Sequence, residues 1–198
     1  MENKVCKFAC IIMASGEGKR FGSNKLMANF AGQPLISYVL SATQNIFEKR
    51  IVVTRHENVA AFAKEREIDF ILHQKPHRND TVRLGLEKIG AGVTHCLFCM
   101  GDQPLITRAS IEKILLAAQK EPNYIWRFIY QETLGAPVLF PAQFFDELKD
   151  LPEGKGGGVL LKKYADRVRT ISVENPQELM DIDTQKDLGN LLKYLEQL

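Results

Sequence analysis

Short runs of apolar residues alternate with amphipathic segments along the whole of this chain. Seven of the runs have the length and residue types of strands, and the segments between them repeat apolar residues at helical spacing. The predicted strands are 8–13, 50–54, 69–73, 95–100, 123–130, 136–140 and 167–173. The predicted helices are 34–46, 58–66, 80–89, 108–120, 142–149, 158–164 and 184–196. Pro34 suits a first helical position, and Asp80 and Thr184 suit helix N-caps.

Continuously apolar strands separated by helices indicate a parallel sheet that is covered on both faces. The exception is the stretch 123–140, where residues 131–135 join two strand-like runs without a helix between them. One of these two strands is therefore expected to run antiparallel, which makes the sheet mixed. The chain has no internal repeat, low-complexity tract or linker, so we expect a single α/β domain over residues 1–198.

Composition is that of an ordinary globular protein, with 45% hydrophobic and 25% charged residues. The net charge of +2 is too small to favour a nucleic-acid or membrane partner, so neither is expected. No apolar stretch approaches the ~20 residues that span a bilayer. The apolar run 8–14 leads directly into a basic glycine-rich loop without a cleavage signature, so we interpret it as a strand and expect a cytoplasmic protein.

The four cysteines, Cys6, Cys10, Cys96 and Cys99, do not predict a metal or redox site. Cys96 and Cys99 are three residues apart in a predicted strand, where they would face opposite sides of the sheet. Cysteine is also among the residue types that are most often fully buried. We expect reduced cysteines packed in two core strands. The four histidines likewise show no spacing typical of metal ligands.

The most informative segment follows the first predicted strand. Residues 14–25 read Ala-Ser-Gly-Glu-Gly-Lys-Arg-Phe-Gly-Ser-Asn-Lys. Exposed backbone N–H groups in a glycine-rich loop form an anion-binding concavity, and Lys19, Arg20 and Lys25 add the charge that a polyphosphate requires. The glycine spacing is neither that of a P-loop nor that of the dinucleotide fingerprint. The segment predicts a loop for a nucleoside diphosphate or triphosphate, with an ordinary solvated loop as the alternative.

Two further acidic segments stand out. Asp102 follows the fourth predicted strand, at the same sheet edge as the glycine-rich loop, and suits Mg²⁺, which binds one or two carboxylates together with phosphate oxygens. The alternative for Asp102 is a helix cap, although Thr107 and Ser110 are better placed to begin the next helix. Asp181 and Asp183 would face the same side of an extended segment. For Asp183 the alternative is a cap of the last helix.

Two other segments could contact a ligand. Residues 78–81, Arg-Asn-Asp-Thr, lie at the start of a predicted helix, and a polar helix N-terminus favours anionic or acceptor-rich ligands. Residues 135–137, Gly-Ala-Pro, could let the backbone approach a substrate or could form a simple turn.

Four segments, in this order, resemble the motifs of the MobA-like nucleotidyltransferases, and most closely those of the molybdenum cofactor cytidylyltransferases. They are residues 14–25, Gly-Asp-Gln-Pro-Leu at 101–105, Gly-x-Pro-Val-Leu-Phe at 135–140 and Asp-Ile-Asp-Thr at 181–184. Ser15 stands where the family usually has a second alanine. The resemblance covers nearly the whole chain. It implies a Rossmann-like, GT-A-like nucleotidyltransferase fold, a three-layer α/β/α sandwich with a mixed, mostly parallel seven-stranded sheet.

The resemblance also implies a reaction. A phosphate on an acceptor attacks the α-phosphate of a nucleoside triphosphate, and pyrophosphate leaves. CTP is the favoured donor and molybdopterin, in molybdenum cofactor maturation, is the leading acceptor. A molybdoenzyme or its maturation factor is a further implied partner, and Mg²⁺ is the implied cofactor.

The same resemblance assigns residues to roles. The implied catalytic residues are Lys25, Arg20 and Asp102, and the implied metal ligands are Asp102, Asp181 and Asp183. The implied nucleotide-binding residues are Ala14, Ser15, Gly16, Glu17, Gly18, Lys25, Asp80, Thr81 and Gly101. Gly135, Pro137 and Lys155 are implied on the acceptor side.

Residues 153–158 depart from the family pattern. Cytidylyltransferases commonly carry Gly-Asp-x-Gly-Ala/Gly-Arg there, whereas this chain has Glu-Gly-Lys-Gly-Gly-Gly, with glycine at the acidic and the arginine positions. Because this loop lies on the acceptor side in the family, two alternatives stay open. One is another phosphorylated acceptor, such as a sugar or alditol phosphate. The other is a nucleotide-binding or cofactor-binding accessory protein without turnover.

Overall fold

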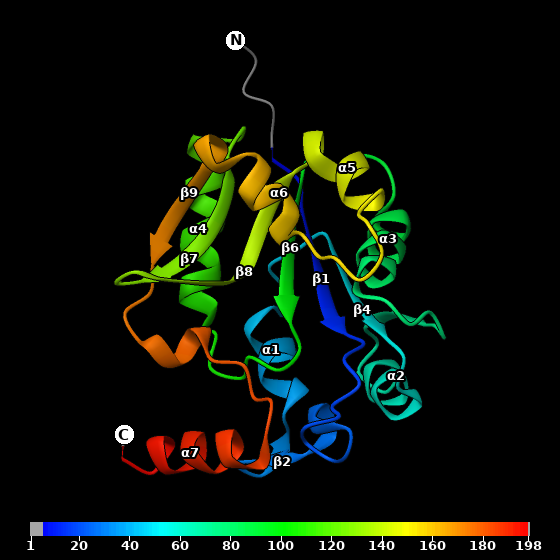
Figure 1. The fold of residues 1–198 in the computed structure, drawn as a ribbon, viewed down its shortest axis with the longest axis vertical. Coiled ribbons are helices and arrows are strands. Elements are labelled where there is room, and N and C mark those ends of the chain that lie inside the picture. The colour runs from blue at the N-terminus through cyan, green and yellow to red at the C-terminus, as the bar shows by residue number, and fades with distance from the viewer. Residues whose placement is uncertain (1–5, 198) are drawn as a thin grey trace.

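The computed structural model describes residues 6–197 and consists of one seven-stranded sheet with helices on both faces (Figure 1). The strands of this sheet are β1 (Phe8–Ala14), β4 (Lys49–Thr54), β5 (Asp69–Leu72), β6 (His95–Met100), β7 (Ile125–Tyr130), β8 (Thr133–Pro141) and β9 (Val168–Ser172). The helices are α1 (Ile36–Ala42), α2 (Glu57–Lys64), α3 (Arg78–Ile89), α4 (Arg108–Lys120), α5 (Phe145–Lys149), α6 (Gly158–Lys163) and α7 (Gln185–Leu195). Short 3₁₀ helices lie at Lys25–Met27, Ala142–Phe144, Ala165–Arg167 and Pro176–Leu179. Each predicted strand and helix is confirmed as an element, although several bounds differ. Within residues 6–197, none of these helices combines the length and apolar character needed to cross a membrane.

The sheet is mixed, as the sequence predicts. Its strand order is β5-β4-β1-β6-β8-β7-β9. Strand β8 is antiparallel to both of its neighbours, whereas the other neighbouring pairs are parallel. The β7–β8 connection consists of Gln131 and Glu132, which is too short for the crossover that a parallel pair requires. The predicted three-layer α/β/α fold with a mostly parallel sheet is therefore confirmed.

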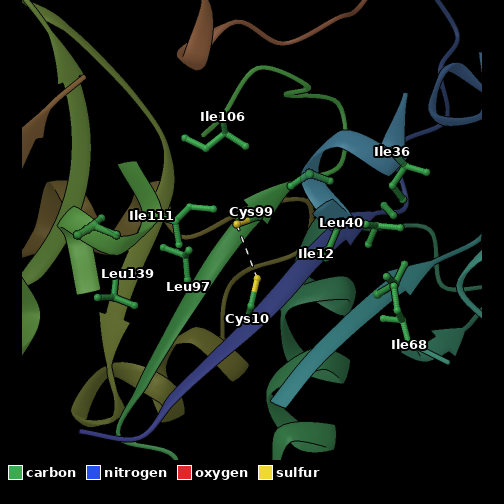
Figure 2. Close-up of a cluster of buried hydrophobic side chains, with 14 of the residues drawn as sticks. Cys10, Ile12, Ile36, Leu40, Ile68, Leu97, Cys99, Ile106, Ile111 and Leu139 are labelled. Carbon is green, nitrogen blue, oxygen red and sulfur yellow. Dashed lines mark hydrogen bonds between the residues drawn. The ribbon is translucent and has the colours of Figure 1, made fainter. Parts of the chain in front are cut away.

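Alternating side chains of the central strands pack into two cores, one on each face of the sheet. Ile12 of β1 belongs to the cluster that includes residues of α1, α2 and α4, whereas its neighbour Ile11 belongs to the cluster that includes residues of α3, α5 and α6. Figure 2 shows Ile36 of α1 and Ile111 of α4 in the same cluster as Ile12. Burial on both faces explains why these strands are apolar without a polar alternation.

The cysteines are free thiols, and the prediction of reduced cysteines in core strands is confirmed for those within strands. Cys96 and Cys99 are both buried, and they belong to opposite cores. The sulfurs of Cys10 and Cys99, on neighbouring strands β1 and β6, lie 3.7 Å apart (Figure 2). Burial raises the pKa of the Cys96 thiol, which makes it a poor nucleophile and metal ligand.

The start of the first helix differs from the prediction. Pro34 does not lie in that helix. It ends β3 (Gln33–Pro34), which pairs with β2 (Asn29–Phe30) in a small antiparallel hairpin. In the turn, Gly32 adopts a φ of 90° and its N–H donates to Asn29 Oδ1 at 2.9 Å. This local turn chemistry overrides the preference of proline for a helix start.

Of the two predicted N-caps, one is confirmed and one is wrong. Thr184 Oγ1 accepts a hydrogen bond from the Asp187 N–H at 3.1 Å and caps α7. Helix α3 has His77 as its N-cap, and the Asp80 carboxylate accepts the His77 N–H at 3.3 Å from within the first turn. The predicted start of α3 lies after the observed one because Asp80 is the third residue of the helix. From there its carboxylate stabilises the N-terminal end, as in a capping box.

The C-terminal segment packs at the edge of the sheet where β1 and β6 end. Leu188 of α7 shares a third hydrophobic cluster with Phe21 and Phe30. Figure 1 shows α7 at the end of the molecule towards which β1 and β6 point. The Ile182 N–H donates to the Asp102 carbonyl at 3.0 Å. The C-terminal acidic segment is therefore fixed beside the loop that follows β6.

Candidate functional site

A polar cleft of about 470 Å³ opens beyond the carboxyl ends of β1, β4 and β6, the edge where open α/β sheets bind ligands. Five cationic side chains and four carboxylates line it. The predicted site residues in its wall are Ser15, Gly16, Glu17, Gly18, Arg20, Lys25, Thr81, Asp102, Asp181 and Asp183. The fold thus brings together the first loop, the start of α3, the loop after β6 and the segment before α7. We call this space the polar cleft.

Three of the predicted nucleotide-binding residues do not line the polar cleft. Ala14 is buried at the end of β1. The Gly101 N–H donates to the Met13 carbonyl at 3.0 Å, so this residue continues the sheet edge. The Asp80 carboxylate is bonded to the His77 N–H and lies 3.1 Å from Arg83. The side chain of Asp80 therefore stabilises the helix end.

The predicted acceptor-side residues separate into two places. Lys155 lines a second cavity, described below. Gly135 and Pro137 lie in β8 and line neither space. A Cβ at Gly135 would come within 3.0 Å of Leu179, so the absence of a side chain there allows close packing by Leu179.

The glycine-rich loop turns back on itself at Gly18. This residue adopts a φ of 62°, and a Cβ there would lie 2.6 Å from the Ser23 carbonyl oxygen. Its carbonyl accepts the N–H groups of Phe21 and Gly22 at 2.9 and 3.1 Å. A Cβ at Gly16, by contrast, would have no atom within 4 Å. Glycine is therefore required at position 18 for the turn, and the backbone at position 16 borders open space.

Ser15 ties this loop to two other strand ends. Its Oγ donates to the Val53 carbonyl at 3.1 Å and lies 2.9 Å from His73 Nε2. His73 Nδ1 accepts the Lys75 N–H at 3.1 Å, which leaves Nε2 to carry the proton and donate to Ser15. Burial, aided by the charge of Arg55, lowers the pKa of His73, so the ring is neutral.

Lys25 lies between two carboxylates. Its Nζ is 2.5 Å from Asp102 Oδ2 and 2.8 Å from Asp183 Oδ1, and its side chain is 9% exposed. Burial opposes the charge of Lys25, but the two carboxylates outweigh it and raise the pKa of the lysine. The hydrogen bond from Lys25 in turn lowers the pKa of Asp183, which also pairs with Arg20 at 2.6 Å. The predicted catalytic residues therefore form one charged network.

Asp181 borders the same network without pairing. Its carboxyl has a pKa raised to about 6, first by burial within the cleft and then by the charges of Asp102 and Asp183. Lys25 and Arg78 offset this only in part. A carboxyl with a raised pKa among other carboxylates is typical of a place where an additional cation would be stabilising.

The carboxylates of the cleft fit a divalent cation that also binds substrate oxygens. Asp102 Oδ1 is buried and has no hydrogen-bond partner among the described residues. Within residues 6–197, no group of three or more His, Cys, Asp or Glu side chains is arranged to hold a metal ion by itself. Mg²⁺ commonly binds one or two carboxylates together with phosphate oxygens and water. The residues therefore suit an ion that arrives with a phosphate ligand.

Thr81 offers an unused hydroxyl to the polar cleft. The residue is 1% exposed, it lines the cleft, and its Oγ1 has no hydrogen-bond partner within residues 6–197. Buried hydroxyl groups in folded proteins are normally hydrogen-bonded. The Thr81 hydroxyl is therefore available for a polar atom of a ligand.

A second space, of about 500 Å³, adjoins the polar cleft between β6, β8, α5 and α6. We call it the apolar cavity. Most of its wall is apolar, and its charged residues are Arg78, Lys155 and Lys162. The glycines of the loop 154–158 close one side. The residues shared with the polar cleft are Met13, Arg78 and Met100.

The sequence interpretation missed Arg55 as a site residue, and it named Arg78 only as part of the segment 78–81, without a role of its own. Arg55 donates to the Ser15 carbonyl at 3.1 Å and pairs with Glu17 at 3.1 Å. A signal for Arg55 was present, because it directly follows β4 at the edge that holds the glycine-rich loop. The signal for Arg78 was its place in the polar start of α3.

The chain is similar to known proteins in both sequence and fold. Residues 10–168 match the family model described as the MobA-like NTP transferase domain. Among curated proteins, 2-C-methyl-D-erythritol 4-phosphate cytidylyltransferase of Dictyoglomus thermophilum is 28% identical over 118 residues. The match covers 55% of this chain and 51% of that enzyme, so the chain spans about half the length of this relative.

Solved structures share the fold over nearly the whole chain. Rv0371c from Mycobacterium tuberculosis H37Rv has a TM-score of 0.85 at 23% identity, covering 94% of this chain and 98% of the other. A structure of Rv0371c in complex with manganese has a TM-score of 0.79 at 22% identity, with the same coverage. CMP:2-keto-3-deoxy-manno-octonic acid synthetase complexed with CTP has a TM-score of 0.75 at 13% identity, covering 97% and 98%. At these identities the likeness shows the fold alone.

Proposed function

The chain belongs to the MobA-like NTP transferase family, and from this premise we propose that it is a nucleotidyltransferase. The proposed reaction moves a nucleoside monophosphate from a nucleoside triphosphate to a phosphorylated acceptor. An oxygen of the acceptor's phosphate forms a bond to the α-phosphorus, and the bond from that phosphorus to the α–β bridging oxygen breaks. The electron pair of the broken bond leaves with pyrophosphate.

The observation that carries this proposal is the meeting of two unlike spaces at one sheet edge. The polar cleft provides cations and glycine backbone suited to a triphosphate. The apolar cavity, which begins at Met13, Arg78 and Met100, provides room for a second substrate. Small-molecule sites commonly measure ~300–1,000 Å³, and both spaces are of that size. Two adjoining spaces fit a reaction between two substrates.

Lys25 and Arg20 are the proposed catalytic cations. Both lie in the wall of the polar cleft and pair with Asp183. A triphosphate would supply new oxygens for these cations, which would neutralise the charge that develops on the leaving pyrophosphate. The proposed role of the backbone at 14–18 is to surround the nucleotide, with Glu17 holding Arg55 in place.

Mg²⁺ is the proposed cofactor, with Asp102 and one of Asp181 or Asp183 as its protein ligands. The buried Asp102 Oδ1 without a partner supports this assignment. The manganese complex of Rv0371c supports divalent metal binding in a protein of the same fold. When bound, such an ion would neutralise charge on the phosphate oxygens.

CTP is the proposed donor. The Dictyoglomus relative is named a cytidylyltransferase, and a structural neighbour is a complex with CTP. Cytosine carries a carbonyl oxygen and an exocyclic amine. The Thr81 hydroxyl could donate a hydrogen bond to the first or accept one from the second. The backbone next to Gly16 is accessible to the same ligand.

Molybdopterin is the proposed acceptor, on the strength of the motif resemblance, with a molybdoenzyme or its maturation factor as the recipient of the product. An alditol phosphate is the second candidate, because the Dictyoglomus relative is named for such an acceptor. The loop 154–158, which borders the apolar cavity, favours a third candidate. This is an accessory protein that binds nucleotide or cofactor without turnover. A single domain over residues 1–198 is part of the proposal.

The test is a matrix of four nucleoside triphosphates against molybdopterin, 2-C-methyl-D-erythritol 4-phosphate and a sugar phosphate, with Mg²⁺ and pyrophosphate release as the readout. Release that requires both CTP and molybdopterin would support the leading proposal. Release with a different acceptor would replace molybdopterin. Tight binding of CTP without release under every condition would favour the accessory protein.

A further inference from the structure

Arg78 lies where the polar cleft meets the apolar cavity. The other two residues that line both spaces, Met13 and Met100, are uncharged. A negatively charged ligand group at this junction would therefore meet one guanidinium, whichever of the two spaces it occupies.

Arg78 also differs from the other four cations of the polar cleft. Each of those cations pairs with Glu17 or Asp183 at distances between 2.5 and 3.1 Å. No ion pair involves Arg78 among residues 6–197, and its Nη2 donates to Met100 Sδ at 3.4 Å. The remaining donors of the guanidinium are therefore available for the planar, two-pronged contact that arginine makes with phosphate.

The loop 154–158 packs against the Arg78 side chain. A Cβ at Gly156 would come within 3.2 Å of the Arg78 Cδ and Nε atoms, so glycine at this position permits the close contact. The neighbouring Asn79 accepts the Gly154 N–H at 3.0 Å. Two successive residues of α3 thus contact the loop that closes the apolar cavity.

The rest of the cavity wall indicates what kind of molecule carries the negative charge. Among the residues that the structure describes, no carboxylate, hydroxyl or amide side chain lines the apolar cavity. A polyhydroxylated body would lose its hydrogen bonds to water there and find few replacements, whereas an aromatic or apolar body would not. Resting on the proposed function, we infer that Arg78 binds the phosphate of an acceptor whose body is aromatic or apolar.

In this position Arg78 brings the two substrates together. The acceptor's phosphate and the donor's triphosphate are both anions, and they repel each other at the distance that reaction requires. A guanidinium at the boundary attracts both and offsets this repulsion. Lys155 and Lys162 line only the apolar cavity, so they can hold an acceptor but do not contact the donor's cleft.

The test measures binding and needs no turnover. 1-Naphthyl phosphate serves as the probe for the apolar cavity, and ribitol 5-phosphate serves as its polyhydroxylated counterpart, both titrated calorimetrically into the intact chain. We expect wild type to bind the naphthyl ester more tightly, and Arg78→Met to weaken that binding at least tenfold. CTP affinity should change less than threefold in Arg78→Met, because the other cations of the polar cleft remain. Arg78→Lys keeps the positive charge but loses the two-pronged guanidinium contact. Its affinity for 1-naphthyl phosphate should therefore fall between those of wild type and Arg78→Met.

The matched control is Lys88→Met, which removes one exposed positive charge from the same helix, far from its first turn, and should leave naphthyl phosphate binding unchanged. Arg78 is exposed, so its variants should keep the wild-type melting temperature. The inference is overturned if wild type does not bind 1-naphthyl phosphate or binds ribitol 5-phosphate more tightly. It is also overturned if Lys155→Met or Lys162→Met lowers the affinity for 1-naphthyl phosphate tenfold while Arg78→Met does not. A failure of pyrophosphate release with every acceptor would instead overturn the proposed function and leave the binding result intact.

Discussion

Lys25 and Asp102 form an ion pair of 2.5 Å across 77 positions of the sequence. The same ammonium lies 2.8 Å from Asp183, so it pairs with two of the three carboxylates that are candidate metal ligands. This contact joins the glycine-rich loop, the loop after β6 and the segment before α7. The predictions below follow from this network and from the polar groups around it.

Lys25→Met and Asp102→Asn should each lower the rate of nucleotidyl transfer by about 10²–10³-fold, because each removes a preorganised charge from the reacting phosphates. The measurement is pyrophosphate release with CTP and the acceptor identified in the matrix. Circular dichroism should show an unchanged fold. Wild-type activity in either variant would contradict the assignment of these residues.

Removal of divalent cations should abolish transfer, and Mg²⁺ or Mn²⁺ should restore it. Three of the four carboxylates in the cleft are candidate ligands, and Lys25 already pairs with two of them, so Mn²⁺ alone should bind weakly. CTP should strengthen Mn²⁺ binding by adding phosphate oxygens and by giving Lys25 another partner. Electron paramagnetic resonance of Mn²⁺, with and without CTP, measures this. Equal Mn²⁺ affinity in the two titrations would contradict the prediction.

Asp181 should make stability depend on pH. Its carboxyl has a pKa of about 6 in the folded protein, compared with an ordinary value of 3.8. Below 3.8 the carboxyl is protonated in both states, and between 3.8 and 6 it ionises first in the unfolded chain. The folded state is therefore penalised as pH rises through this window, and the penalty is complete above it.

Asp181→Asn should consequently raise the melting temperature at about pH 7 and have little effect at about pH 4. The gain should be modest, because Asp181 borders solvent and water screens its interactions. Thermal unfolding of both proteins at the two pH values is the measurement. A gain that is the same at both would show that the charge of Asp181 is not its cause.

Thr81→Val should weaken CTP binding without destabilising the fold. The hydroxyl has no hydrogen-bond partner in the described part of the chain, so its removal costs no internal hydrogen bond there. A lost hydrogen bond to the ligand would be worth about 1–1.5 kcal/mol, or roughly five- to tenfold in affinity. Calorimetric titration with CTP tests the first part, and thermal unfolding tests the second. Unchanged CTP affinity would remove Thr81 from the nucleotide site.

Ser15→Ala should lower the free energy of unfolding by about 1–3 kcal/mol, because it leaves the buried His73 Nε2–H without a partner. Adding His73→Leu should recover part of that loss, because the unpaired ring N–H is removed, although the Lys75 N–H then loses its acceptor on His73. Urea denaturation of wild type, both single variants and the double variant forms the cycle. Strictly additive effects would show that the two side chains are not coupled.

Much of the fold followed from local patterns. The apolar runs identified each strand of the main sheet, and those of β1 and β6 are uninterrupted because these central strands are buried on both faces. The short 131–135 stretch predicted the antiparallel strand, since no crossover fits there. Pro34 and Asp80 were placed wrongly because the same residue types occur in more than one local structure. Proline suits a strand end as well as a helix start, and aspartate stabilises a helix N-terminus from the cap or from the third position.

The sequence by itself determined the class of fold, the glycine-rich loop after β1 and the acidic residues around the polar cleft, because these depend on residue types at short spacing. Only the tertiary structure decided which charges meet. It paired Lys25 with Asp102, gave Asp181 like-charged neighbours, left Thr81 without a partner and placed Arg78 between two cavities. These relationships join segments that are distant in sequence. They depend on strand order and helix packing, which no local pattern encodes.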